Sequence, residues 1–248
     1  MLDQQPRRGA GSEAGGSQAV RTLWRVGVVP WLCRFAAALV ALLVAIVLSM
    51  VLYRWVDPPT TPTLAWRWLT GEAVDQRWVP LADISPNLIN AVIAAEDSRF
   101  CRHRGIDFGE LSAAIEESLE GNPRGASTIT MQVVKNLYLW LDRSYLRKAI
   151  ELPLALALDF VMPKRRILEI YLNLAEWAPG VYGAEAGAQY HFGRPARRLS
   201  IAEAARLAVT LPAPTVRDAG EPSARHQRLA DRVAARVRAG VDAACLAR

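Results

Sequence analysis

The stretch FAAALVALLVAIVLSMVLY, residues 35–53, divides this chain into two unequal parts. It carries no charged residue, and Ser49 is its only clearly polar member. As an α-helix it would be about 28 Å long, close to the thickness of the hydrocarbon core of a bilayer. It is flanked by Trp24, Trp31 and Trp55, as membrane spans often are by interfacial aromatic residues. We predict a transmembrane anchor helix over residues 35–53.

Two other interpretations of this stretch are weaker. A cleaved signal peptide has a shorter apolar region and a small-x-small cleavage site, and the sequence MVLYRWVDPP at the end of the stretch offers none. A helix buried in a soluble core is seldom so uniformly apolar. The spanning interpretation is therefore preferred.

The charges beside the anchor predict its orientation. Before it stand Arg21, Arg25 and Arg34 with no acidic residue among them, whereas Arg54 is soon balanced by Asp57. Because basic residues accumulate on the cytoplasmic side, we expect a cytoplasmic N-terminus and an extracytoplasmic remainder. The chain would cross the membrane once.

The rest of the chain divides by composition. Residues 1–34, rich in Gly, Ser and Arg, predict a disordered cytoplasmic tail, and the proline-containing residues 54–65 predict a stiff linker. The folded domain is expected over residues 66–215. Residues 216–248 predict a basic C-terminal helix or tail, in which apolar residues recur at a spacing of four; a surface helix is favoured over one that touches the membrane.

Composition limits the partners without choosing one. The chain has 248 residues, of which 52 % are hydrophobic and 22 % charged, enough for one core with appendages. A formal net charge of +6 suits phospholipid headgroups, pyrophosphates or nucleic acid. A solvated, arginine-rich surface is the simpler explanation of the charge taken alone.

The cysteines and histidines do not indicate a metal site. Cys33, Cys101 and Cys245 show no ligand spacing, and the three histidines are scattered. An oxidising compartment would permit a disulfide between Cys101 and Cys245, but nothing in the sequence requires one. We expect free, buried thiols.

From Ser85 onward the pattern is mainly helical. Ser85 and Pro86 supply an N-cap and a first-turn proline, and Ser200 with Glu203 forms a capping box. Breaks rich in glycine and proline fall at residues 121–125 and 178–180. There is no internal repeat and no run of alternating strands, so we predict a mainly α domain.

The first segment with chemical potential begins at Glu96 and Asp97, where an apolar helix ends. A partly desolvated carboxylate there would have a raised pKa, which suits general acid or base catalysis. The structural alternative is a pair of local ion pairs with Arg99 and Arg102.

The second segment is GASTITMQVVKN, residues 125–136. Small and hydroxylated residues lead into a helix start, where backbone N–H groups bind anions readily, and Lys135 could add a charge. An ordinary Ser/Thr cap with a solvated lysine is the alternative. No Gly-Lys-Ser/Thr follows the glycine, so nucleotide hydrolysis is not indicated.

The third segment is RSYLRKAIE, residues 143–151. On a helix, Arg147 and Glu151 share a face as an i, i+4 pair, with Arg143 a turn earlier. This pattern is either a surface ladder of ion pairs or a cationic stripe for a pyrophosphate leaving group.

These segments resemble the motifs of the glycosyltransferase module shared by class A penicillin-binding proteins and monofunctional biosynthetic peptidoglycan transglycosylases. The matched patterns are E-D-x-x-F-x-x-H-x-G at residues 96–105, G-x-S-T-I-x-x-Q-x-x-K-N at 125–136, R-K-x-x-E at 147–151, I-L-E-x-Y-L-N at 167–173 and a looser glycine-containing block at 180–193. The resemblance covers roughly residues 78–214. Met131 and His191 depart from the pattern without touching a proposed carboxylate or cation. No Ser-x-x-Lys transpeptidase motif follows, which resembles the monofunctional branch.

The resemblance implies a lysozyme-like helical lobe with a small membrane-proximal jaw, and polymerisation of lipid II into β-1,4 glycan strands by inverting displacement. The implied catalytic residues are Glu96, as general base, and Glu151, which would order the cations or share a divalent ion such as Mg²⁺ or Mn²⁺. The implied substrate-binding residues are Ser127, Gln132, Lys135, Asn136, Arg143, Arg147 and Lys148. Glu169 and Asn173 are expected to be structural.

The implied partners are lipid II, the lipid-linked growing glycan and the bilayer, with division or elongation proteins as further candidates and no nucleic acid. Two rival functions remain at the level of sequence. A lysozyme-like hydrolase would also use a glutamate in a helical lobe, but would need neither the cationic stripe nor the anchor. A non-catalytic scaffold of the cell-wall machinery would need the anchor but not Glu96.

Overall fold

The computed structural model describes residues 29–121, 125–140 and 144–247. Arg143 and most of the predicted N-terminal tail, with Arg21, Trp24 and Arg25, lie outside the described residues. The described residues divide into two units, one that ends at Leu48 and one that begins at Ser49.

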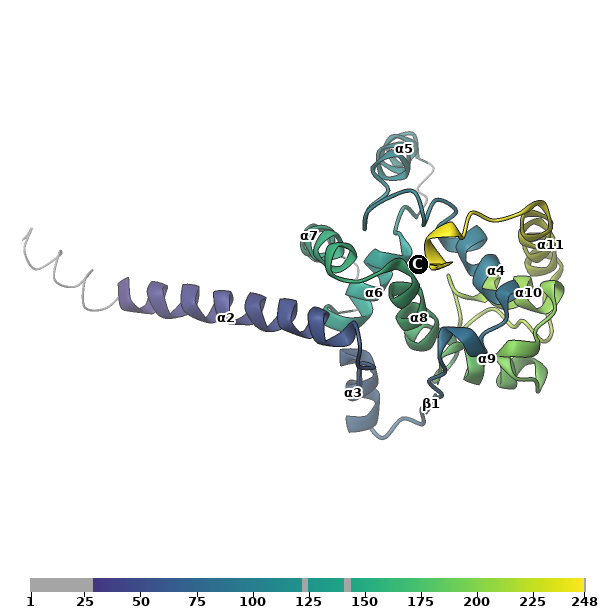
Figure 1. Cartoon of the computed structure of the whole chain (residues 1–248), viewed down its shortest axis with the longest axis horizontal. Helices are drawn as coiled ribbons and strands as arrows, with labels where there is room; N and C mark the ends of the chain where they lie inside the picture. Colours follow the sequence, from purple (N-terminus) through teal and green to yellow (C-terminus); the bar gives the residue numbers. More distant parts are fainter. Residues whose placement is uncertain (1–28, 122–124, 141–143, 248) are drawn as a thin grey trace, which may run out of the picture. The chain divides into compact units, whose positions relative to one another are not determined.

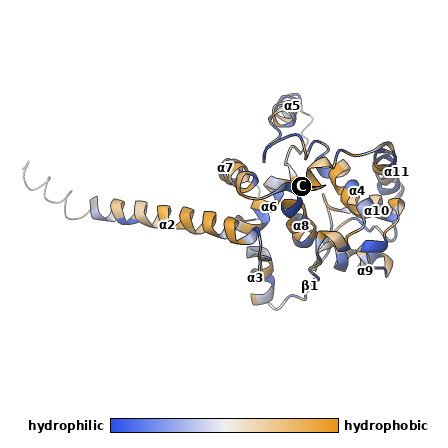
Figure 2. Cartoon of the chain, viewed as in Figure 1, coloured by the Kyte–Doolittle hydropathy of each residue, from blue (hydrophilic) through white to orange (hydrophobic). Residues whose placement is uncertain are grey.

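The helix α2 (Val29–Tyr53) contains the predicted anchor and begins six residues before it, at Val29. By length and composition it could cross a membrane. Apolar side chains along its course, among them Trp31, Phe35 and Leu48, are exposed, and Figure 2 shows it as hydrophobic over most of its length. The helix fits a single-pass membrane anchor.

Residues 49–248 are mainly helical, as predicted. In chain order the elements that follow α2 are α3 (Pro62–Leu69), β1 (Asp75–Gln76), η2 (Leu81–Asp83), α4 (Pro86–Glu96), α5 (Phe108–Leu119), α6 (Ile129–Tyr138), α7 (Tyr145–Val161), α8 (Lys164–Leu174), β2 (Glu176–Ala178), β3 (Val181–Tyr182), α9 (Ala184–Phe192), η3 (Ala196–Arg198), α10 (Ile201–Thr210), α11 (Ala224–Ala239) and η4 (Ala244–Ala247).

Two groups of helices build the domain (Figure 1). In one, α4, α10 and α11 pack against one another; in the other, α6 packs against both α7 and α8. The strands, in the order β1-β3-β2, form a small sheet in which β3 runs parallel to β1 and antiparallel to β2. The core includes the fully buried Phe100, Tyr171 and Trp177. α4 therefore brings its C-terminal end, with Glu96, to one side of this core.

The predicted helix starts at Ser85 and Ser200 are confirmed. The Ser85 hydroxyl accepts a hydrogen bond from the backbone N–H of Asn87, with Pro86 in the first turn of α4. At α10, Ser200 and Glu203 form the reciprocal capping box. Both signals are local, which is why the sequence was sufficient to find them.

A helix starts inside the stretch predicted as a linker. Pro62 occupies the first turn of α3, where its missing N–H costs no hydrogen bond, and the Thr61 hydroxyl caps the helix by accepting from Leu64 N. Leu64 is fully buried. The proline taken as a helix breaker is thus the beginning of a packed helix.

The predicted C-terminal helix is present as α11 (Ala224–Ala239), and it is packed into the fold. α11 packs on α4 and α10 and buries His226, Ala230, Val233 and Ala234. The apolar residues noted at a spacing of four, Leu229, Val233 and Val237, lie on or beside this face. The folded unit accordingly extends beyond residue 215.

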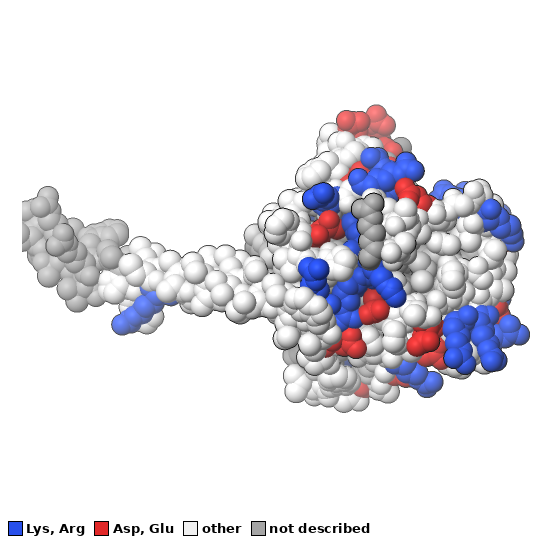
Figure 3. Space-filling view, in the orientation of Figure 1, with Lys and Arg blue, Asp and Glu red and all other residues white. Residues whose placement is uncertain are grey.

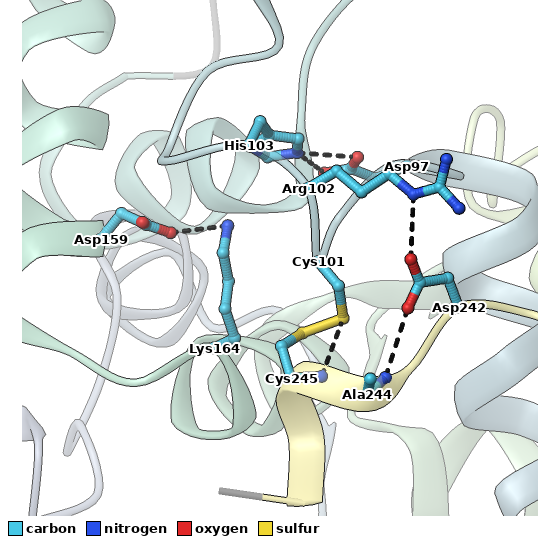
Figure 4. Close-up of a disulfide and its surroundings, with 9 residues drawn as sticks. All are labelled: Asp97, Cys101, Arg102, His103, Asp159, Lys164, Asp242, Ala244 and Cys245. Carbon is cyan, nitrogen blue, oxygen red and sulfur yellow. Dashed lines mark hydrogen bonds and ion pairs between the residues drawn. A yellow bond between two sulfur atoms is a disulfide. The ribbon is translucent and has the colours of Figure 1, made fainter.

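The expectation of free thiols is wrong for two of the cysteines. Cys101 and Cys245 form a disulfide with their Cα atoms 5.4 Å apart, as Figure 4 shows. The C-terminal segment returns to the loop after α4, where Arg102 also pairs with Asp242 at 2.9 Å. The residues are 144 positions apart, so no local pattern could have paired them. Cys33, on α2, is free and exposed.

Candidate active site

Glu96 is the last residue of α4, and its carboxylate meets a side chain of α6. Gln132 Nε2 donates a hydrogen bond to Glu96 Oε2 at 2.9 Å. The other end of the same amide is held from α8, because Tyr171 Oη donates to Gln132 Oε1 at 3.3 Å. Three helices therefore fix the position of the Glu96 carboxylate.

The environment of Glu96 changes its proton affinity. Burial raises the pKa of Glu96, while the Gln132 hydrogen bond and the positive charges of Lys135 and Arg217 counteract part of that rise. Desolvation is the largest effect. A carboxyl group with a raised pKa can hold or release a proton nearer to neutral pH, as a general acid or base requires.

Asp97, the next residue, is buried and has a different role. Its Oδ2 accepts a hydrogen bond from the backbone N–H of Ile129 at 2.9 Å, and His103 Nε2 lies 2.9 Å from its Oδ1. Ile129 is the first residue of α6. Asp97 thus ties the start of α6, and with it Gln132, to the end of α4.

The alternative explanation of the acidic pair, local ion pairs with Arg99 and Arg102, is wrong. Arg99 pairs with Asp107 at 3.3 Å, and Arg102 with Asp242. The partners of the two carboxylates are instead Gln132 for Glu96, and Ile129 N and His103 for Asp97.

Gly105 joins the first motif to two other elements. Its φ of +76° favours glycine, and a Cβ there would lie 2.5 Å from the carbonyl oxygen of Ala155 in α7. Its own carbonyl accepts a hydrogen bond from Thr128 Oγ1 at 2.6 Å, while the same hydroxyl accepts from Met131 N as the cap of α6. The predicted Ser/Thr cap is therefore confirmed at Thr128.

The third segment forms a buried cluster rather than a surface ladder. Glu151 Oε2 accepts from Arg147 Nη1 at 2.8 Å, and its Oε1 accepts from Lys148 Nζ at 3.0 Å. The Glu151 side chain is only 2 % exposed. Lys148 also donates to Ser127 Oγ at 2.9 Å, which connects α7 to the residues before α6. Figure 3 shows Lys and Arg side chains interspersed with acidic ones in the middle of the domain surface.

Lys135 lies within electrostatic reach of both proposed catalytic carboxylates. Burial lowers the pKa of Lys135; Glu151 and Glu96 favour its charged form, whereas Arg147 and Lys148 oppose it. The fold thus brings the acidic residues of the first and third segments around one lysine of the second.

Four of the proposed substrate-binding residues line two cavities, whereas Arg147 and Lys148 line neither of them. Gln132, Lys135 and Asn136 line one of about 240 Å³, with residues of α3, α8 and β3. Ser127 lines a second of about 290 Å³, together with Glu96. The hydrogen bond between Gln132 and Glu96 connects a lining residue of the first cavity to a lining residue of the second.

Some residues of the site were missed by the sequence, and others proved structural. Tyr171 falls in a matched motif but carried no expected role, and nothing local marked Arg217. Asn173 has the structural role expected of it, because its side chain pairs with both the N–H and the carbonyl of Val79 at 2.9 Å. Glu169 likewise accepts from Leu81 N at 2.8 Å.

The family resemblance also implies that Glu151 could share a divalent ion. Across the described ranges, no group of three or more His, Cys, Asp or Glu side chains comes together in a way that could hold a metal ion. Both oxygens of Glu151 already accept hydrogen bonds from basic side chains. The immediate partners of Glu151 are thus cationic, which does not fit a bound divalent metal.

A helical domain with an apolar N-terminal helix, a desolvated glutamate and adjacent basic side chains is typical of an enzyme that acts on an anionic substrate. The family model described as transglycosylase matches residues 64–238, and the chain belongs to this family.

Curated relatives agree with that assignment. A biosynthetic peptidoglycan transglycosylase of Agrobacterium fabrum is 49 % identical over 209 residues, covering 83 % of this chain and 92 % of that protein. Proteins of the same name from Rhodopseudomonas palustris and Rhodospirillum centenum are each 52 % identical, over 80 % and 73 % of this chain and 85 % and 79 % of theirs.

Proposed function

We propose that this chain is a peptidoglycan glycosyltransferase that polymerises lipid II, releasing undecaprenyl pyrophosphate. The observation that carries the proposal is the desolvated carboxylate of Glu96, which is hydrogen-bonded to Gln132 and interacts electrostatically with Lys135. The names of the relatives, which match most of this chain, support the same substrate class.

Glu96 is the general base of the proposed reaction. It takes the proton from the 4-hydroxyl of the acceptor sugar as that oxygen attacks the anomeric carbon of the donor. The bond from that carbon to the pyrophosphate breaks, and its electron pair leaves with the phosphate oxygen. One displacement on an α-linked donor gives the β-1,4 product with inversion. Gln132 holds the carboxylate in position for the proton transfer.

Basic residues stabilise the leaving group. Lys135 and Lys148 would bind the pyrophosphate oxygens as negative charge develops on them. Ser127 adds a hydroxyl already bonded to Lys148. Asn136, beside Lys135 in the same cavity, would contact the donor. Arg143 is proposed for the same role from its motif alone.

Glu151 acts through its partners. It holds Arg147 and Lys148 on one side of α7, at 2.8 Å and 3.0 Å. A buried carboxylate between two cations keeps them ordered for the anionic substrate at the cost of part of their charge. Glu151 is thus a positioning residue in this proposal.

The enzyme is proposed to work at the outer face of the cytoplasmic membrane, anchored by α2 with its N-terminus inside. α5 and α7 expose large apolar side chains, including Phe108, Leu119, Tyr145 and Phe160, which are 63 %, 84 %, 97 % and 88 % exposed. Such a surface favours contact with lipid. We propose that these helices form the membrane-proximal jaw, which would place the site near lipid-linked substrates.

The test is polymerisation of purified lipid II by the full chain in proteoliposomes, followed on gels. Glu96→Gln is expected to abolish polymer while the far-ultraviolet circular dichroism remains that of the native protein. Glu116→Gln, on the exposed side of α5, is the matched control and should polymerise normally. Shortening of preformed glycan without polymer from lipid II would instead favour a hydrolase.

A further inference from the structure

A third cavity beside Glu96 is lined by basic residues that the proposed mechanism leaves unused. It has a volume of about 330 Å³ and lies where α4, α10 and α11 pack together (Figure 1). Besides Glu96, its charged lining residues are Arg217, Arg232 and Arg236. We call this cavity the arginine pocket.

Two of the arginines are fixed by backbone carbonyls. Arg217 Nη1 donates to Val209 O at 2.7 Å, and Arg236 Nη1 donates to Ala94 O at 3.0 Å. A guanidinium group has five N–H donors, so each of these arginines keeps others for a ligand. The bonds restrict both side chains to the pocket, which lowers the entropic cost of binding an anion there.

Arg232 is the arginine of the pocket whose side chain makes no hydrogen bond or ion pair with other described residues. It is also exposed to solvent. The pocket holds three positive charges against the single carboxylate of Glu96. This excess attracts anions to the side of Glu96 that faces α11.

The pocket is separate from the cations assigned to the pyrophosphate. Lys135 belongs to α6 and Lys148 to α7, whereas the arginines belong to α11 and the segment before it. Arg236 also lines the cavity that contains Ser127, so the pocket opens beside the reacting groups. A substrate at Glu96 could therefore reach both groups of cations with different parts of its structure.

We propose that the arginine pocket binds the carboxylates of the peptide carried by the acceptor disaccharide. The inference rests on the proposed function. The hydroxyl that Glu96 deprotonates belongs to one sugar of the acceptor disaccharide, so the other sugar and its peptide extend from Glu96 over the neighbouring surface, where the arginine pocket lies. Peptidoglycan precursors carry short peptides with free carboxylates, and planar guanidinium groups bind carboxylates in bidentate geometry. The pocket would make peptide-bearing lipid II the preferred acceptor.

The experiment compares three substrates with the full chain in proteoliposomes: lipid II with its intact peptide, the same lipid-linked disaccharide without the peptide, and lipid II whose peptide carboxylates are converted to amides. The native enzyme is expected to favour the first. The preference is the ratio of kcat/KM for the first substrate to kcat/KM for each of the others. Arg232→Gln is expected to lower this ratio about three- to five-fold, the effect of losing one exposed charge pair. Arg232→Glu should lower it further.

The matched control is Arg238→Gln, because Arg238 lies on α11, is exposed and does not line the pocket. It should leave the preference at the native value. An unchanged preference in Arg232→Gln, or an equal loss on the peptide-free substrate, would overturn the proposal, since the peptide-free substrate keeps the pyrophosphate. Failure of the native enzyme to polymerise any substrate would count against the proposed function instead.

Discussion

The amide of Gln132 lies 2.9 Å from the carboxylate of Glu96, although the two residues are 36 positions apart in the chain. Tyr171, fully buried on α8, holds the other end of that amide. The carboxylate that the mechanism needs as a base is therefore oriented by neutral groups. Lys135 and Arg217 affect it through their charge, and among the described residues neither forms a hydrogen bond with it.

Gln132→Leu is expected to shift the pH dependence of the reaction. The Gln132 hydrogen bond lowers the pKa of Glu96 against the larger effect of burial, so its removal raises that pKa further. Less of the base form is then present at a given acidic pH. The acidic limb of kcat/KM should move to higher pH, measured as lipid II polymerisation rate across a pH series. A limb that stays in place while the rate falls uniformly would show that Gln132 does not act through Glu96.

Tyr171→Phe is expected to lower kcat about five-fold with little change in KM. The hydroxyl donates a neutral hydrogen bond to Gln132, and such a bond contributes about 1 kcal/mol, which corresponds to roughly that factor in rate. The ring stays buried, so the fold should survive. Steady-state kinetics gives the comparison, with Tyr190→Phe on the exposed side of α9 as the control that should behave as the native enzyme.

Glu151→Gln is expected to destabilise the domain as well as slow the reaction. The change removes the negative charge that Arg147, whose side chain is 11 % exposed, and Lys148 share. Breaking a buried ion pair from one side costs about 3–5 kcal/mol, and we expect about 2–3 kcal/mol here because Arg147 reaches the surface in part. Denaturant unfolding should show the loss. Glu120→Gln, at the exposed end of α5, should unfold at the native denaturant concentration.

Local signals in the sequence were sufficient to predict where several helices begin. Ser85, Thr128 and Ser200 all cap helices as their neighbours suggested. Pro62 was misjudged because the same residue can end one helix or begin the next, and only the burial of Leu64 decides between them.

The site itself could be predicted only as separate motifs. Glu96 and Glu151 were both predicted to be catalytic, but their shared environment around Lys135 depends on how α4, α6 and α7 pack. The role of Asp97 was not predictable either. A carboxylate that receives the first N–H of a distant helix looks the same in a sequence as one that pairs with the next arginine.

Cys245→Ser is expected to lower stability without removing the catalytic residues. The disulfide closes a loop of 144 positions and connects the C-terminal segment to the loop that follows Glu96. Bonds that close loops of this size typically stabilise by about 2–4 kcal/mol, which would correspond to a fall in Tm of about 4–16 °C for a domain of this length. Thermal unfolding of the native and variant proteins measures the effect.

Thiol titration of the denatured native protein should detect Cys33 alone before reduction and all three cysteines after it. Detection of three thiols before reduction, in protein secreted through an oxidising compartment, would contradict the bond, and Cys33→Ser should leave the unfolding temperature unchanged because that residue is exposed on α2 and forms no disulfide.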